Sequence, residues 1–329
     1  MTLLRACPNL ERLALDHALS HITGVPDHPQ ATSALVTLPR LRTLSLHHPL
    51  DLNARILACL TTPAVSRVEL SDNTSDTDHD NVLNRSHTFA AILPPNRAAI
   101  LPAALISRIV SVVFTSEKQD HLVSCDDGQD ETVLDLRLTA DDDVGSWYND
   151  LTHVGARDIA TILVGASVLR LDLSIDFECI NRDGLASMFR GMGQLQSLKL
   201  GGRGDFDKTF EVLTPGEDGS ESEAEERSDR PQVLEVLCPQ LRSIPVCHFW
   251  NHSLGNAPLF ETILEMLRAR EAYGTARLDS LSIELMQETE DEYRELHDKY
   301  VPQLQQLVEE VEYEHEDYVE YDPEFDWGI

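Results

Sequence analysis

The 329-residue chain is poor in positive charge, in cysteine and in long apolar runs. Its 26 lysine and arginine residues stand against 57 acidic residues, which gives a formal net charge of −31. Such a charge repels nucleic-acid phosphates and anionic lipid surfaces, so neither is an expected partner and a soluble partner is favoured instead. No apolar run approaches the roughly 18 residues of a membrane-spanning helix, so we expect no membrane contact.

The six cysteines are scattered, and no secretory signal follows Met1. This usage predicts free thiols in a reducing compartment, cytoplasmic and/or nuclear. No cysteine and histidine set has the spacing of a zinc site, and no nucleophile or metalloprotease motif is present. We therefore expect no metal, no cofactor and no enzymatic activity.

One short phrase recurs along the chain, with apolar residues at positions i, i+3 and i+5. It occurs nine times, with first positions 24 to 46 residues apart, a spacing typical of solenoids. The nine triplets are Leu10/Leu13/Leu15, Leu41/Leu44/Leu46, Val65/Val68/Leu70, Ile109/Val112/Phe114, Val133/Leu136/Leu138, Val168/Leu171/Leu173, Leu195/Leu198/Leu200, Leu241/Ile244/Val246 and Leu278/Leu281/Ile283. Cys7 and Cys238 each lie three residues before a triplet, which predicts that both are small buried hydrophobic residues.

Each triplet ends in the alternation of a half-buried strand, and helical periodicity follows between triplets, as in 51–62, 182–192 and 258–271. One such unit cannot cover its own apolar strand face, so neighbouring units must stack and share a core. The sequence therefore predicts an α/β solenoid, a horseshoe of about nine irregular helix-strand units. Parallel strands line its concave face and helices its convex face.

The triplets resemble the L-x-x-L-x-L signature of leucine-rich-repeat proteins from about Leu3 to Leu285. The phrases CPNLERL, LPRLRTLSL and CPQLRSI resemble most closely the repeat region of fungal F-box/leucine-rich-repeat proteins. That resemblance implies substrate recognition for a Skp-cullin-F-box ubiquitin ligase. No F-box is found in the chain, so a Skp-type adaptor and a cullin are implied only if an F-box lies upstream.

Six residues precede Cys7, too few for the cap that covers a terminal repeat. We therefore expect an N-terminally shortened member of this group. The apolar edge around Leu3, Leu4, Leu10 and Leu13 should then be open to water.

The expected domain organisation is a solenoid over 1–287 and a C-terminal capping helix with an acidic tail over 288–329. Residues 214–231 hold 7 acidic and 2 basic side chains and few apolar ones, which predicts a disordered insertion within the solenoid. Ser220 and Ser222 in this insertion each have Glu three residues later, a pattern of acidophilic kinase sites. The capping helix is expected to open at Pro302 and to align Val301, Leu304, Leu307, Val308 and Val311 on one face.

The favoured function is non-enzymatic protein recognition by a monomer through the concave strand face. The candidate binding residues are the charged positions between or just before the buried strand positions: Arg12, Arg67, Glu69, Asp135, Arg137, Arg170, Asp172 and Lys199.

Two alternatives stay open. The tail from Glu309 to Ile329 has ten acidic residues up to Asp326 and no basic one, as in a regulatory acidic module. Gly202 to Thr209 almost spells a phosphate-binding loop, which would indicate a nucleotide-binding enzyme. Asp207 stands where that loop needs glycine, and its carboxylate would repel the phosphate.

Overall fold

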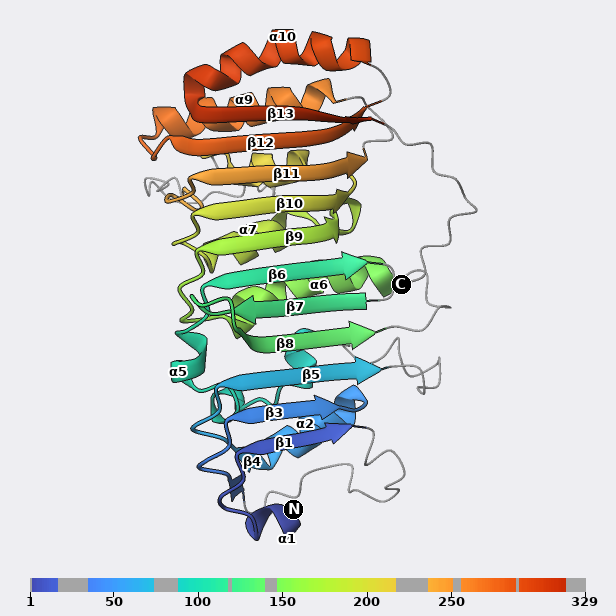
Figure 1. Cartoon of the computed structure of the whole chain (residues 1–329), viewed down its shortest axis with the longest axis vertical. Coiled ribbons are helices and arrows are strands. Elements are labelled where there is room, and N and C mark those ends of the chain that lie inside the picture. Colours follow the sequence, from blue (N-terminus) through green and yellow to red (C-terminus); the bar gives the residue numbers. More distant parts are fainter. Residues whose placement is uncertain are drawn as a thin grey trace, which may run out of the picture.

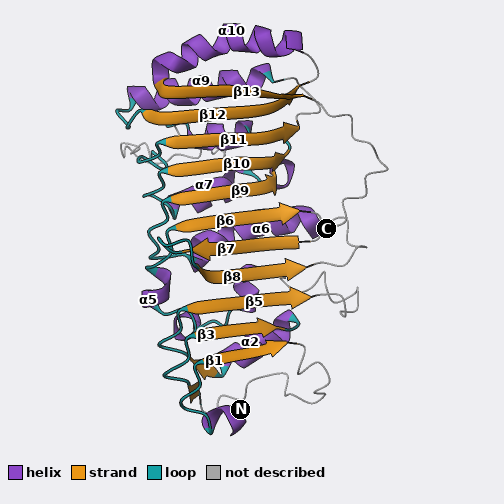
Figure 2. Cartoon of the chain, viewed as in Figure 1, coloured by secondary structure: helices purple, strands orange, loops and turns teal. Residues whose placement is uncertain are grey.

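The computed structural model describes residues 2–16, 35–73, 88–117, 120–139, 147–216, 236–250, 256–287 and 290–317. One mostly parallel sheet of eleven strands runs the length of this part of the chain, and helices lie behind it (Figures 1 and 2). The predicted α/β class is thereby confirmed. The proposed insertion beyond residue 216, with Ser220 and Ser222, lies outside the described residues.

The strands of the large sheet, in spatial order, are β1 (Arg12–Asp16), β3 (Thr43–His47), β5 (Arg67–Asn73), β8 (Thr132–Thr139), β7 (Asp120–Asp126), β6 (Ser111–Glu117), β9 (Arg170–Asp176), β10 (Ser197–Arg203), β11 (Ser243–Trp250), β12 (Leu278–Gln287) and β13 (Val308–Asp317). A separate pair consists of β2 (Val36–Thr37) and β4 (Leu60–Thr61). The helices are α1 (Thr2–Arg5), α2 (Leu50–Ala58), α4 (Phe89–Ile92), η2 (Arg97–Ala99), α5 (Ala103–Ile106), α6 (Trp147–Ile162), η3 (Phe177–Cys179), α7 (Arg182–Arg190), α8 (Asp207–Leu213), α9 (Ala257–Ala272) and α10 (Glu290–Leu307).

The apolar triplets form the core between the sheet and the helices. Every triplet residue from Leu41 to Ile283 is buried, whereas Leu10 and Leu15 of the first triplet are half-buried. The helices pack against one another in chain order from α6 to α10. Sheet and helices therefore share one continuous apolar layer, as the stacking argument requires.

One backbone pattern repeats where neighbouring units meet. The carbonyl oxygen of Glu11, one residue into the first triplet, accepts hydrogen bonds from the N–H groups of Arg42 and Thr43 at 2.8 and 3.1 Å. Five further carbonyl groups accept two consecutive N–H groups of the next unit in the same way, those of Arg42, Val110, Leu169, Gln196 and Arg242. Equivalent positions in successive triplets thus have equivalent bonds.

The strand order departs from a simple succession between β5 and β9. After β5 the chain skips two places to β6, turns back as the antiparallel strand β7, and places β8 beside β5. The prediction that all strands are parallel is therefore wrong for β7, and β6 and β8 are in inverted order. The physical cause is a tight turn after β7, where Asp127 Oδ1 accepts the N–H groups of Gln129 and Glu131 at 2.8 and 3.2 Å and Asp130 adopts φ +57°.

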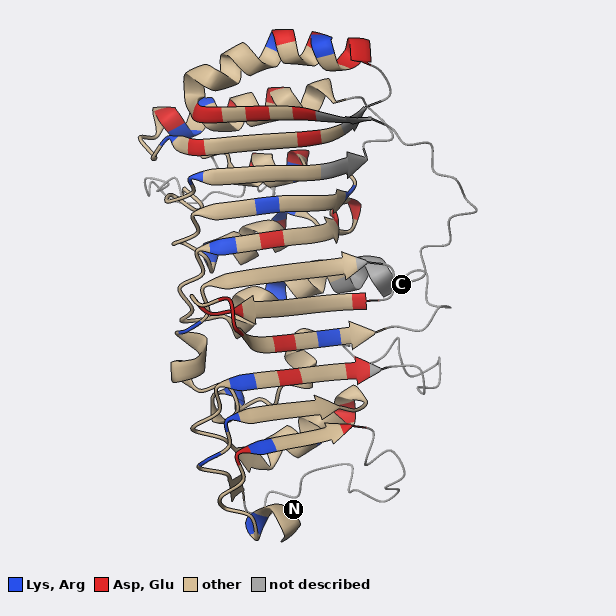
Figure 3. Ribbon diagram, in the orientation of Figure 1, with Lys and Arg blue, Asp and Glu red and all other residues tan. Residues whose placement is uncertain are grey.

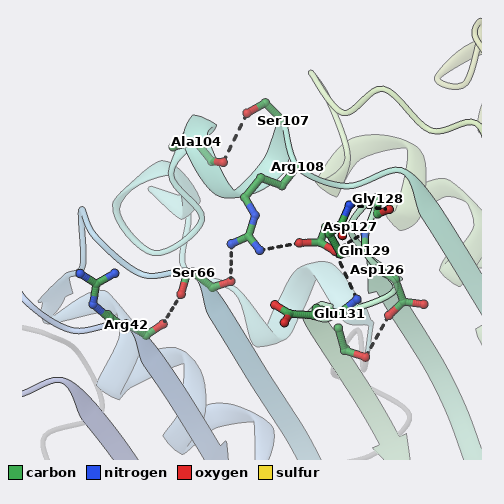
Figure 4. A network of polar contacts seen from close by, with 11 residues as sticks. Arg42, Ser66, Ala104, Ser107, Arg108, Asp126, Asp127, Gly128, Gln129 and Glu131 are labelled. Atoms are coloured by element: carbon green, nitrogen blue, oxygen red, sulfur yellow. Dashed lines mark hydrogen bonds and ion pairs between the residues drawn. The ribbon is translucent and has the colours of Figure 1, made fainter.

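A side chain replaces the repeated backbone bond at this insertion (Figure 4). The carbonyl oxygen of Ser66 is equivalent in the triplet to the carbonyl oxygens that accept two N–H groups in the other units. Strand β8, however, is shifted by two residues relative to β5, so that Val68 pairs with Leu134 and not with Leu136. Arg108 Nη1 donates to Ser66 O at 3.4 Å, and Arg108 Nη2 lies 2.6 Å from Asp127 Oδ2. Arg108 therefore ties β5 to the turn between β7 and β8.

The C-terminal segment differs from the predicted capping helix. Helix α10 begins at Glu290, contains Pro302 in its interior and ends at Leu307, so the predicted helical positions Val308 and Val311 lie in β13 instead. Strand β13 pairs with β12 in the register Leu278 with Val308 and Leu281 with Val311. Part of the predicted acidic tail is therefore the last strand of the sheet.

The N-terminal edge is open, as expected, at Leu3, which is 81% exposed, while Leu4 and Leu10 are half-buried. Leu13 is only 8% exposed, contrary to prediction, because it packs beside Leu44 of β3. Cys238 is buried as predicted, but Cys7 is exposed. No described strand packs outside β1, which leaves the position of Cys7 uncovered.

Candidate protein-binding face

One side of the sheet is covered by none of the helices in the described part of the chain, and we call this side the exposed face. Because side chains alternate along a strand, the residues between the buried triplet positions point to this side. Strand register aligns them in a middle rung that crosses all eleven strands: Ala14, Ser45, Glu69, Asp135, Ser124, Val113, Asp172, Lys199, Pro245, Ser282 and Glu312. A second rung, two residues further along each parallel strand, contains Asp16, His47, Ser71, Arg137, Leu122, Thr115, Ser174, Gly201, Cys247, Glu284 and Glu314.

The eight predicted binding residues all lie in strands of this sheet, and seven of them come from its central strands β5, β8, β9 and β10 (Figure 3). The eighth, Arg12, is exposed on the edge strand β1. Asp135 and not Arg137 occupies the middle rung, because the β5–β8 pairing is displaced by two residues. The central strands thus place on one face charges that are up to 132 positions apart in the chain, from Arg67 to Lys199.

Most of these charges form ion pairs with one another or with a neighbouring turn. Arg67 Nε donates to Glu69 Oε1 at 2.7 Å, and Lys199 Nζ donates to Asp172 Oδ2 at 2.8 Å. The hydrogen bond from Lys199 to Asp172 raises the pKa of the lysine ammonium group. These pairs are partly exposed, so each contributes about 1 kcal/mol or less to stability. Because so little stability depends on them, their side chains can reorient to bind a partner.

Asp130 is a functional candidate that sequence reasoning missed. It lies in the turn after β7, and its Oδ1 accepts a hydrogen bond from Arg170 Nη2 at 2.8 Å. The signal in the sequence is the turn composition of 126–131, DDGQDE, whose neighbour on the sheet could not be known without the strand order.

Asp135 and Arg137 lie side by side on β8 at the centre of the face. Asp135 is half-buried, and burial raises the pKa of its carboxyl group, which the guanidinium group of Arg137 partly offsets. Arg137 is exposed and makes no hydrogen bond or ion pair with any residue in the described part of the chain. Its donors are therefore open to a ligand.

A group of side chains that hydrogen-bond to one another lies beside these charges. His47 has Ser45 Oγ 2.9 Å from Nε2 and Ser71 Oγ 2.5 Å from Nδ1. The three residues come from the neighbouring strands β3 and β5. They give the N-terminal part of the face fixed hydrogen-bonding groups, which the charge-based prediction did not include.

The last two strands make the C-terminal end of the face acidic. Glu284 of β12 and Glu310, Glu312 and Glu314 of β13 alternate with buried or half-buried apolar residues, and the three residues of β13 are exposed. The red segments at this end of the sheet in Figure 3 show that the rungs of these strands present no positive charge. The face therefore changes from mixed charge in the middle to negative charge at β13.

The near match to a phosphate-binding loop does not form a phosphate cradle. Lys208 Nζ donates to the backbone carbonyls of Phe177 and Ile180 at 3.3 and 3.4 Å. Asp207 lies in the same loop, and burial, followed by the neighbouring Asp205 carboxylate, raises the pKa of its carboxyl group to about 6. The lysine thus fastens η3, and a carboxyl group lies where a phosphate would have to bind.

Metal and membrane features are also absent from the described residues. No group of three or more His, Cys, Asp or Glu side chains among them is placed to hold a metal ion. None of the helices that the structure describes is both long enough and apolar enough to cross a membrane.

A scan against protein-family models and searches of curated proteins and of solved structures find nothing that matches this chain.

Proposed function

We propose that this chain is a leucine-rich-repeat protein without enzymatic activity and that it recognises another protein through the exposed face of its sheet. The observation that carries the proposal is the repeated unit boundary, in which equivalent carbonyl groups accept two N–H groups at six places. Together with the buried triplets, this repetition supports a solenoid whose strands, apart from β7, run parallel on a concave face.

The character of the exposed face supports protein binding. Polar, charged and small side chains cross eleven strands in regular rungs, so the face offers an extended surface and not a closed cavity. Extended surfaces of mixed polarity suit a protein, because a protein partner has enough area to contact several rungs at once. Repeat proteins use their continuous faces in this way.

The link to a ubiquitin ligase depends on the sequence resemblance alone and forms a separate, finer part of the proposal. An F-box upstream of this chain would supply the Skp-type adaptor and cullin. Co-purification of a Skp-type adaptor with a form extended upstream, and not with residues 1–329, tests that part.

The experiment for the main proposal is a quantitative affinity purification with a matched pair of charge reversals. Lys199→Glu changes the exposed face, and Arg157→Glu makes the same kind of change at an exposed position of α6 in the helix layer. We expect specific partners to be lost with Lys199→Glu and retained with Arg157→Glu. The reverse pattern would contradict binding through the sheet.

A further inference from the structure

Two apolar side chains lie among the polar residues at the centre of the exposed face. Val113 is in the middle rung on β6, and Leu122 is in the second rung on β7. Val113 pairs with Ser124 and Leu122 pairs with Thr115, so Val113 and Leu122 are diagonal neighbours on adjacent antiparallel strands. Both are half-buried, so that part of each side chain stays accessible to a partner on the exposed face.

This apolar pair exists because of the insertion in the strand order. Strand β7 brings its His121, Val123 and Cys125 into the core and turns Leu122 outward. Strands β7 and β6 are the fifth and sixth of the eleven strands, so the apolar pair lies at the middle of the face. Interface energy is concentrated in such central apolar positions when polar residues surround them.

Arg137 is the direct cross-strand neighbour of Leu122 on β8. The other cations near the centre, Arg67, Arg170 and Lys199, donate to carboxylates of this chain, whereas Arg137 makes no such bond within the described residues. A guanidinium group beside an apolar surface binds carboxylates strongly, because contact with the partner removes water from the pair.

We propose that Val113, Leu122 and Arg137, which we call the central patch, bind a short linear segment of a partner protein that carries an acidic side chain next to a large apolar one. The apolar side chain covers Val113 and Leu122, and the carboxylate accepts hydrogen bonds from Arg137. This inference rests on the proposed protein-binding function and specifies the chemistry of the partner.

The acidic end of the face fixes the direction in which the segment extends. Residues that lie over β12 and β13 meet Glu284, Glu310, Glu312 and Glu314, and a second acidic residue there would be repelled. Neutral or basic residues should therefore follow the acidic and apolar pair on the side toward β13.

The test uses a library of random 12-residue peptides selected against the immobilised full chain. We expect enrichment of sequences with Asp or Glu within two positions of Leu, Ile, Met or Phe. Affinities of the selected peptides are then measured for wild type, Arg137→Gln, Arg137→Glu, Leu122→Thr and Lys199→Glu, with Arg157→Gln on α6 as the matched control.

Arg137→Gln should weaken binding about tenfold or more, as expected when one charged hydrogen-bonded pair is lost at an interface, and Arg157→Gln should leave it unchanged. Replacing the peptide's acidic residue by Lys should weaken its binding to wild type and restore binding to Arg137→Glu. Leu122→Thr should also weaken binding. Its folding is checked by thermal unfolding, and the exposed Arg137 variants keep the test valid if it fails to fold.

The outcomes separate this inference from the proposed function. Selected peptides that lack the acidic and apolar pair would overturn the central patch. So would peptides that bind Arg137→Gln as tightly as wild type but no longer bind Lys199→Glu. Both results would still be compatible with protein binding through the exposed face. Peptides that are insensitive to every variant of the face overturn both. A library that yields no specific binder overturns the central patch, because a short linear segment is what it specifies.

Discussion

His121 offers a quantitative test of the β6–β7–β8 insertion. Its side chain is 1% exposed, and its Nδ1 lies 2.8 Å from Ser116 Oγ, which in turn lies 2.6 Å from Thr152 Oγ1 of α6. Burial lowers the pKa of His121 to about 4, against a smaller opposing effect of the Asp120 carboxylate. The histidine is therefore neutral in the folded protein at pH values where it is already charged in the unfolded chain.

The consequence for stability follows from linkage. The contribution of His121 is fully present above the unfolded pKa of about 6.5 and is lost as the pH falls toward the folded pKa. With one pKa unit corresponding to about 1.4 kcal/mol, the loss is about 2 kcal/mol at pH 5 and about 3 kcal/mol at pH 4.

The assay compares urea unfolding of wild type and His121→Gln at pH 7.5, 5 and 4. At pH 7.5 we expect the variant to be less stable by about 1 to 2 kcal/mol, since it disturbs buried packing and a hydrogen bond. The gap should close or reverse by pH 4. Other groups, such as Asp158 with its raised pKa, act equally in both proteins and cancel in the difference. A gap that stays constant from pH 7.5 to pH 4 would refute the burial of a neutral His121.

Three further changes test other parts of the structure. Arg108→Ala should lower the unfolding midpoint and speed amide exchange in β5 and β8 more than Arg157→Ala does, and unchanged exchange would show that Arg108 does not tie these strands together. Gly202→Ala should lower the free energy of unfolding by about 2 kcal/mol or more, because Gly202 has φ +114° and an added Cβ would collide with the carbonyl group of Ile175. Chemical denaturation measures this change, and unaltered stability would contradict the geometry. Lys208→Ala should lower the free energy of unfolding by about 1 kcal/mol, because it removes the hydrogen bonds that hold η3. Calorimetry should detect no binding of ATP to the wild-type protein. ATP binding that this substitution abolishes would favour the enzyme alternative.

The sequence allowed the prediction of the repeated units but not of their order. The i, i+3, i+5 pattern identifies the buried side of each strand because burial of apolar side chains determines it locally, and Leu41 to Ile283 confirm this. Strand β7 escaped detection because His121 interrupts its apolar alternation. Strand β13 escaped detection because glutamates surround Val308 and Val311 and because the third position of the same spacing is Tyr313, whose polar hydroxyl group weakens the apolar pattern.

The candidate face was predicted only in part for a related reason. Alternation shows which side a residue such as Arg137 occupies, whereas its neighbours depend on strand pairing between distant segments. Leu122 is brought next to Arg137 by an antiparallel turn, and Asp130 is brought next to Arg170 by the same turn. Such long-range placements are set by packing of the whole sheet and not by local propensity.

The central claim, that the exposed face of the sheet is where a protein partner binds, is tested most directly by site-specific photocrosslinking in cells. A benzophenone side chain is placed in turn at Ala14, Ser124 and Lys199 in the middle rung, and at Arg157 and Glu265 on α6 and α9. We predict that the same partner is crosslinked from the three rung positions and from neither helix position. Crosslinks from the helix positions with none from the rung would contradict the account.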